Sequence, residues 1–166
     1  MANELKGKEG GCLCGRIRYR LEDDPMFVQS CHCTDCQRAT GSAFVTNMWI
    51  EEDKVTLLGE KPTSIKNTSG SGAVHEVFRC EKCGTNIYSK YHASIGTDIM
   101  VRAGTLDDTS VVEPMAHVFV RSKQPWVQLP DDKPQFEEFY SPSKIWPESS
   151  RARLMALIET ARASQE

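Results

Sequence analysis

The chain has 166 residues, with 20 basic and 23 acidic side chains and a formal net charge of −3 at pH 7. This length suits one domain with a hydrophobic core, and no stretch reaches the length of a bilayer span. The chain has no Lys/Arg block of the kind that neutralises phosphates in nucleic-acid-binding proteins. We therefore expect one folded domain with no nucleic-acid partner and no membrane partner.

The N-terminal residues 1–9 are polar and predict a flexible lead-in. They lack an apolar run after their charges, so we expect no secretory signal and a cytoplasmic location. Thiols stay reduced in the cytosol, and the odd number of cysteines, seven, leaves any disulfide scheme one short. The cysteines are therefore interpreted as metal ligands.

The first predicted strand covers residues 16–21. There Ile17, Tyr19 and Leu21 alternate with arginines, which is the period of a strand with one buried face. Further short β-rich runs follow, and many are separated by turn signals such as the glycines and serines of residues 69–72. These runs span residues 44–50, 55–58, 76–79, 86–90, 99–103, 116–120 and 126–129. The pattern predicts a mainly β fold built from antiparallel sheets.

Two segments have helical signals. Residues 34–40 predict a short helix, with Thr34 suited to its N-cap and Gly41 to its end. Residues 149–163 predict a longer amphipathic helix. Its apolar side chains at helical spacing are Leu154, Leu157, Ile158 and Ala161. We expect this helix to dock against the sheet or against a second copy of the chain, which leaves a homo-oligomer open.

The cysteines form three short clusters. These are a CxC pair (Cys12, Cys14), a CHCxxC run (Cys31, Cys33, Cys36) and a CxxC pair (Cys80, Cys83). A glycine after the second cysteine of a pair eases the tight turn that offers two sulfurs to one ion. Gly15 and Gly84 have this position. The two glycine-marked pairs therefore predict one four-thiolate zinc site, which is coordinatively saturated and structural.

The middle cluster supplies three thiolates from one segment, a strand end that leads into a short helix whose N–H groups favour thiolates. Three protein ligands leave one zinc position open. Three thiolates on a divalent cation give a net charge of −1, which suits an incoming sulfur better than the activation of water. The cluster is interpreted as a catalytic zinc site for a small thiol.

A closed site of three cysteines and one histidine is the alternative interpretation of this cluster. His32 points away from its neighbours if the segment is extended, which makes it an awkward fourth ligand. His75, His92 and His117 are the other candidate donors. An ordinary surface or core role competes with metal binding for each of these histidines.

The chain contains, in this order, the segments GGCLCGRIRY, SCHCTDCQRATGSAF, FRCEKCGTNIY and AHVFVRSKQPW. Over about residues 10–140 they resemble the glutathione-dependent formaldehyde-activating enzyme family, which also includes the centromere protein V domain. The resemblance implies an Mss4-like fold of antiparallel β-sheets that binds two zinc ions. It places a structural zinc on Cys12, Cys14, Cys80 and Cys83 and a catalytic zinc on Cys31, Cys33 and Cys36. Residues 1–9 then form the lead-in, and residues 141–166 a helical extension of the same domain.

The resemblance also implies an activity. It is that of a zinc-dependent carbon–sulfur lyase, which forms or cleaves a thiol–aldehyde adduct such as S-hydroxymethylglutathione at the three-cysteine zinc. Glutathione is the expected cosubstrate, and a small thiol and an aldehyde are the expected partners. The alternative function is a non-catalytic, zinc-stabilised binding module with the same fold.

Several other side chains are weaker candidates for a role near the site. Four are able to pair with the carboxylates of a tripeptide thiol, although each also suits an ordinary surface or turn position: Arg38, Ser42, Arg79 and Lys123. The late block holds His117 and Trp126, which we expect to pack near the metal-bearing core. The remaining late aromatic residues are expected to cover the sheet or a subunit contact. These are Phe119, Phe136, Phe139 and Tyr140.

Overall fold

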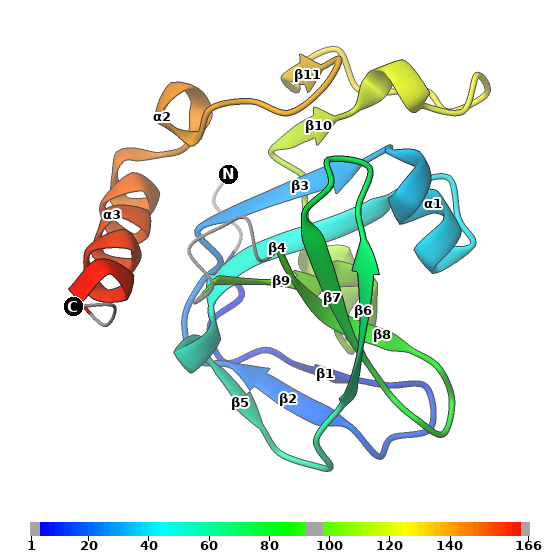
Figure 1. Ribbon diagram of the computed structural model, residues 1–166, viewed down its shortest axis with the longest axis vertical. Helices are drawn as coiled ribbons and strands as arrows, with labels where there is room; N and C mark the ends of the chain where they lie inside the picture. Colours follow the sequence, from blue (N-terminus) through cyan, green and yellow to red (C-terminus); the bar gives the residue numbers. More distant parts are fainter. Residues whose placement is uncertain (1–3, 92–97, 164–166) are drawn as a thin grey trace.

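The computed structural model describes residues 4–91 and 98–163, which form two β-sheets and three α-helices (Figure 1). The strands are Glu9–Gly11 (β1), Arg18–Leu21 (β2), Phe27–Cys31 (β3), Val45–Glu51 (β4), Val55–Leu57 (β5), Thr63–Thr68 (β6), Val74–Arg79 (β7), Asn86–Tyr91 (β8), Asp98–Arg102 (β9), Ala116–Val118 (β10) and Gln135–Phe136 (β11). The α-helices are Thr34–Thr40 (α1), Pro142–Ile145 (α2) and Glu148–Ala163 (α3). Short 3-10 helices cover Glu52–Lys54, Ala103–Thr105, Thr109–Val111 and Val120–Ser122.

The larger sheet has eight strands in the order β11-β10-β3-β4-β9-β8-β7-β6, and the smaller sheet has the order β1-β2-β5. Strand pairing is antiparallel except that β10 runs parallel to both β3 and β11. The prediction of a mainly β, mainly antiparallel fold is therefore confirmed. The parallel exceptions arise because β10 returns to β3 through a long connection and not through a hairpin.

Most of the predicted strands are present with boundaries shifted by at most two residues, and β2 has the expected alternation. Ile17, Tyr19 and Leu21 are buried, whereas Arg18 and Arg20 are partly exposed. The helix predicted over residues 34–40 is α1, and Gly41 ends it in a left-handed conformation as expected.

The prediction of a strand over residues 126–129 is wrong. The chain turns there, and the N–H of Val127 donates to the carbonyl of Gln124. Pro125 and Pro130 bracket the segment, and a proline has no N–H to give to a sheet ladder. Trp126 is consequently 70% exposed and does not pack against the core, contrary to expectation.

The sequence did not predict β1, β6 or β11, and it suggested only the end of β3. All five residues of β3 are buried, so this strand lacks the alternation that marks a half-exposed strand. Leu5, which lies within the expected lead-in, is fully buried. The backbone N–H groups of Leu5 and Lys6 donate to the Asp24 carboxylate at 2.6 and 2.8 Å.

The C-terminal helix α3 docks on the large sheet, as predicted. Arg153 donates from Nε to one oxygen of the buried Glu51 carboxylate at 2.7 Å and from Nη2 to the other at 2.5 Å. Its Nη1 donates to the carbonyl of Asp24 at 2.8 Å. Leu154 and Leu157 pack beside the same sheet. The polar and apolar contacts together fix the helix against the domain.

The core has two parts, and each contains one group of cysteines. One part includes Cys12 and Cys80 and lies between the two sheets. The other includes Cys31 and Cys36 and lies where the large sheet meets α1 and the C-terminal segment (Figure 1). Among the described residues, no helix combines the length and apolar character needed to cross a membrane.

Candidate metal centres

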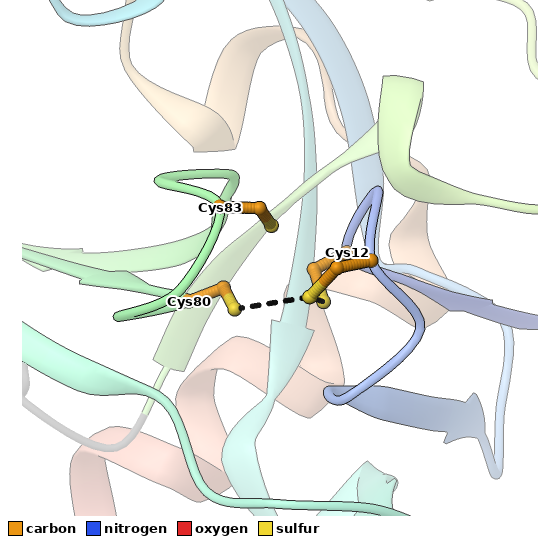
Figure 2. A group of neighbouring side chains, drawn as sticks. Cys12, Cys80 and Cys83 are labelled. Atoms are coloured by element: carbon orange, nitrogen blue, oxygen red, sulfur yellow. Dashed lines mark hydrogen bonds between the residues drawn. The ribbon is translucent and has the colours of Figure 1, made fainter.

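The first candidate centre joins two loops that are far apart in the sequence. Cys12 and Cys14 follow β1, and Cys80 and Cys83 follow β7. Their four sulfur atoms lie within 4.8 Å of one another. Figure 2 shows Cys80 and Cys83 on one loop, directed toward the loop that carries Cys12. The structure thus brings together the same four cysteines that the glycine positions grouped.

Both loops turn sharply at a glycine. Gly15 and Gly84 have φ values of +77° and +74°, a region that other residues rarely adopt. Their N–H groups donate to the carbonyls of Cys12 and Cys80 at 3.0 and 2.9 Å. These turns place both sulfurs of each pair on the same side of its loop.

The spacing and chemistry of this group fit a zinc ion. The sulfur–sulfur distances are 3.5 Å for Cys12 and Cys14 and 3.7 Å for Cys14 and Cys80. Four sulfurs about 2.3 Å from a central zinc lie roughly 3.8 Å apart in a tetrahedron. The hydrogen bond from Thr85 lowers the pKa of the Cys83 thiol to about 5, which favours the thiolate that zinc requires.

The second candidate centre lies at the junction of β3 and α1. Cys31 is the last residue of β3, Cys33 is the N-cap of α1, and Cys36 is in its first turn. The three sulfur atoms lie within 4.8 Å of one another. Three thiols that share so small a volume are a suitable donor set for a soft cation such as zinc.

The helix cap corrects one prediction and explains the local charge. The cap is Cys33 and not Thr34: its sulfur accepts from the N–H of Cys36 at 3.3 Å. Hydrogen bonds from Cys31 and Cys36, together with N–H groups at the start of α1, lower the pKa of the Cys33 thiol. The first turn of the helix therefore stabilises a negative sulfur.

No histidine among the described residues joins the three sulfurs. His32 is fully buried, and its Nε2 lies 3.1 Å from Nδ1 of His117. His75 stacks on Tyr91 with ring centroids 4.2 Å apart. His92, the remaining candidate donor, lies outside the described residues. The described part of the chain thus supplies three ligands of one kind to this centre.

A hydrogen-bond network that the sequence did not predict holds the cysteine segment in place. Gln37 of α1 donates to the carbonyls of His32 and Ser122 at 2.7 and 2.9 Å. Gln124 donates to the side-chain oxygen of Gln37 at 2.7 Å. The backbone between Cys31 and Cys33 is thereby tied to a loop almost ninety positions later. No local motif signals this contact.

The sequence also missed Arg102 at the end of β9. Its side chain is 6% exposed and donates to Asn47 on β4 and to Ser89 on β8. The available sequence signal for Arg102 was its position directly after the apolar run of residues 99–101. By contrast, Arg38 and Arg79 are exposed, and Ser42 and Lys123 donate to nearby backbone carbonyls.

A pocket of about 490 Å³ lies between the end of α1, the start of β4 and the loop that carries Cys83. Val45 of β4 forms part of its wall and packs in the same cluster as Cys31 and Cys36. Arg102 also lines this pocket. The pocket therefore touches the four-cysteine centre through Cys83 and adjoins the cluster of the three-cysteine centre through Val45.

Comparison with known proteins places these features in a family. The profile described as "Glutathione-dependent formaldehyde-activating enzyme" matches residues 7–122, a span that includes both cysteine groups. The chain belongs to the glutathione-dependent formaldehyde-activating enzyme family. The resemblance inferred from the cysteine segments is thereby confirmed for this family.

Two individual proteins are similar to this chain. A Halomonas elongata protein named "Putative glutathione-dependent formaldehyde-activating enzyme" is 23% identical over 127 residues, which cover 73% of this chain and 80% of that protein. The crystal structure of a Rhodobacter sphaeroides protein is similar with a TM-score of 0.47 and 16% identity. That alignment covers 64% of this chain and 91% of the other.

Proposed function

We propose that this family member is a zinc-dependent carbon–sulfur lyase that forms or cleaves an adduct between glutathione, or a similar small thiol, and formaldehyde or a related aldehyde. The observation that carries the proposal is the convergence of three sulfurs at the β3–α1 junction, with no fourth ligand among the described residues. The proposal includes two zinc ions per chain, an Mss4-like fold and a cytoplasmic location.

The two cysteine groups have different roles in this proposal. Cys31, Cys33 and Cys36 hold the catalytic zinc, and the four-cysteine group holds a structural one. A zinc ion bound by three thiolates supplies an open position that keeps an incoming thiol deprotonated, although a free thiol has a pKa of about 8.5. In this proposal the centre with three ligands is therefore catalytic, and the centre with four ligands is structural.

The reaction itself needs little acid or base assistance from the chain. The substrate sulfur bonds to the carbonyl carbon, the C=O double bond becomes a C–O single bond, and the proton lost by the thiol is replaced by one taken up on oxygen. The chain contributes proximity and a fixed orientation of the two substrates. The N–H groups at the start of α1 stabilise negative charge on Cys33 beside the reacting sulfur.

The test is the exchange rate between free formaldehyde and S-hydroxymethylglutathione, measured by NMR with zinc-loaded protein. We expect the wild-type protein to accelerate exchange and Cys33→Ser to remove this acceleration. The circular dichroism spectrum of Cys33→Ser should keep its β-sheet signal, which shows that the variant is folded. Ser64→Ala on the exposed strand β6 is the control and should behave like the wild type. An acceleration that survives in Cys33→Ser would contradict catalysis at this centre, whereas no acceleration by the zinc-loaded wild type would favour the non-catalytic binding module.

A further inference from the structure

The pocket that adjoins both cysteine groups has a distinctive lining. Arg102 is the one cationic side chain among its described lining residues, Cys83 of the four-cysteine group also lines it, and no carboxylate of the described chain does. The other polar side chains carry hydroxyl or amide groups: Thr40, Ser42, Thr46, Thr85, Asn86 and Thr105. A lining with one cation and several neutral hydrogen-bonding groups suits a small polar anion.

No carboxylate among the described residues pairs with the guanidinium of Arg102, and the negative groups that act on it are the sulfurs of Cys31, Cys33 and Cys36. Nη1 donates to the Asn47 amide oxygen, and Nη2 donates to the Ser89 hydroxyl at 3.0 Å, so both partners are neutral. Nε is buried with no hydrogen-bond partner. Burying an arginine is costly unless its charge is balanced and its donors are satisfied. The unpartnered Nε therefore indicates a hydrogen-bond acceptor that the described chain does not supply.

The strand register places Arg102 on the same face of the sheet as Cys31. Cys31 of β3 lies opposite Val45 of β4, and Asn47 of β4 lies opposite Arg102 of β9. Val45 and Asn47 are two residues apart on one strand, so all four side chains share one face. Two strand spacings and two residues separate the Cα atoms of Cys31 and Arg102 by roughly 12 Å. Part of this separation is spanned by the arginine side chain.

We propose that Arg102 binds a carboxylate of the thiol substrate while the substrate sulfur lies at the three-cysteine centre. The pocket then selects thiols that carry a negative charge a few bonds from sulfur. Nε and the free N–H of Nη2 form a fork that matches the two oxygens of a carboxylate. Asn47 and Ser89 hold this fork in position. This inference rests on the proposed function, because it assigns a binding residue to the carboxylate end of the same thiol substrate.

The decisive experiment compares a charged thiol, 3-mercaptopropionate, with its uncharged methyl ester. Their dissociation constants are measured by titration calorimetry on zinc-loaded wild-type protein. We expect the acid to bind about 10- to 100-fold more tightly than the ester, as charge-assisted hydrogen bonds typically provide. This comparison needs no variant, so it does not depend on whether a change at Arg102 folds.

Three variants then assign the effect to one side chain. Arg102→Gln should abolish the preference for the acid, and Arg102→Lys should retain part of it, because lysine keeps the charge without the fork. Arg38→Gln is the matched control, since Arg38 is exposed on the helix that carries Cys36, and its preference should equal that of the wild type. Circular dichroism and zinc content are measured for each variant.

The outcomes separate this inference from the function on which it rests. Equal binding of acid and ester by the wild type, or an unchanged preference in folded Arg102→Gln, would overturn the carboxylate site and leave the proposed lyase intact. Failure of both thiols to bind zinc-loaded protein would overturn both. A preference lost in Arg102→Gln and kept in Arg38→Gln supports the site.

Discussion

Single residues determine whether the cysteine loops close correctly. The knuckle at Gly15 needs a positive φ, and a Cβ at this position would meet no atom within 4 Å. The cost of replacing this glycine is therefore conformational and not steric. The left-handed region costs about 1–2 kcal/mol for a residue with a Cβ.

We accordingly expect Gly15→Ala to lower the free energy of unfolding by about 1–2 kcal/mol, measured by urea denaturation of zinc-loaded protein. Gly104→Ala is the matched control, because Gly104 also has open space around its Cα but no positive φ. It should change stability by less than about 0.5 kcal/mol. Equal effects in the two variants would contradict the conformational explanation.

Tyr140 links the C-terminal segment to the large sheet through its hydroxyl. It donates to the Gln29 side chain and accepts from Nε1 of Trp146 at 3.0 Å, and all three groups are buried. Tyr140→Phe would leave a buried amide oxygen and a buried indole N–H unpaired. We expect a loss of about 1–3 kcal/mol in the free energy of unfolding, measured by thermal or urea denaturation.

The control for Tyr140→Phe is the same change at Tyr88. Tyr88 is buried, but its hydroxyl makes no hydrogen bond within the described chain. Tyr88→Phe should therefore alter stability by less than about 0.5 kcal/mol. Zinc content should stay at the wild-type value in both variants, since neither residue belongs to a cysteine group. Similar losses in both would argue against a role for the Tyr140 hydroxyl.

At the scale of elements, alternation and turn residues predicted the half-exposed strands and little else. The arginines of β2 reveal its buried face, whereas the uniformly buried β3 has no alternation to detect. The exposed β6 has no apolar face at all and exists because it pairs with β7. Local pattern fails for strands whose stability comes mainly from their neighbours.

The contact of α3 with the sheet includes one ion pair that a helical pattern does not reveal. Arg153→Ala would leave Glu51, which is 7% exposed, without its guanidinium partner. We expect the free energy of unfolding to fall by about 1–3 kcal/mol and α3 to exchange its amide hydrogens faster. Hydrogen exchange with mass spectrometry measures the second effect.

Arg151→Ala is the control for this contact, because Arg151 is exposed on the same helix. Both changes create an alanine and raise helix propensity similarly, so a difference between them reports the pair with Glu51. If Arg153→Ala and Arg151→Ala gave the same exchange rates in α3, the ion pair would not be what holds the helix.

At the scale of the whole molecule, the cysteine partition was predictable and the rest of the site was not. Short spacings and two glycines identify which sulfurs meet, since these signals are local. Arg102 could not be placed, because its bonds to Asn47 and Ser89 depend on the register of three strands. The pocket lining likewise joins α1, β4 and β9, which no single segment of sequence brings together.

Metal removal tests the two groups together. We expect about two zinc ions per chain by elemental analysis, one of which a chelator removes faster because its centre has an open position. Loss of the second zinc ion should strongly lower the urea concentration at the midpoint of unfolding, since structural zinc contributes about 10–16 kcal/mol in small peptides. Zinc, but not magnesium, should restore the midpoint. A midpoint unchanged in metal-free protein would contradict a structural role for the four-cysteine group.

The separation of the cysteines along the chain also sets the order in which the two centres assemble. Cys31, Cys33 and Cys36 leave the ribosome almost together, so their sulfurs are available to one ion early in synthesis. The other group waits until Cys83 has been made, and closing so long a loop costs roughly 3–4 kcal/mol beyond a constant. During synthesis, the three-cysteine centre proposed to be catalytic thus has all its cysteines before the four-cysteine group proposed to be structural does.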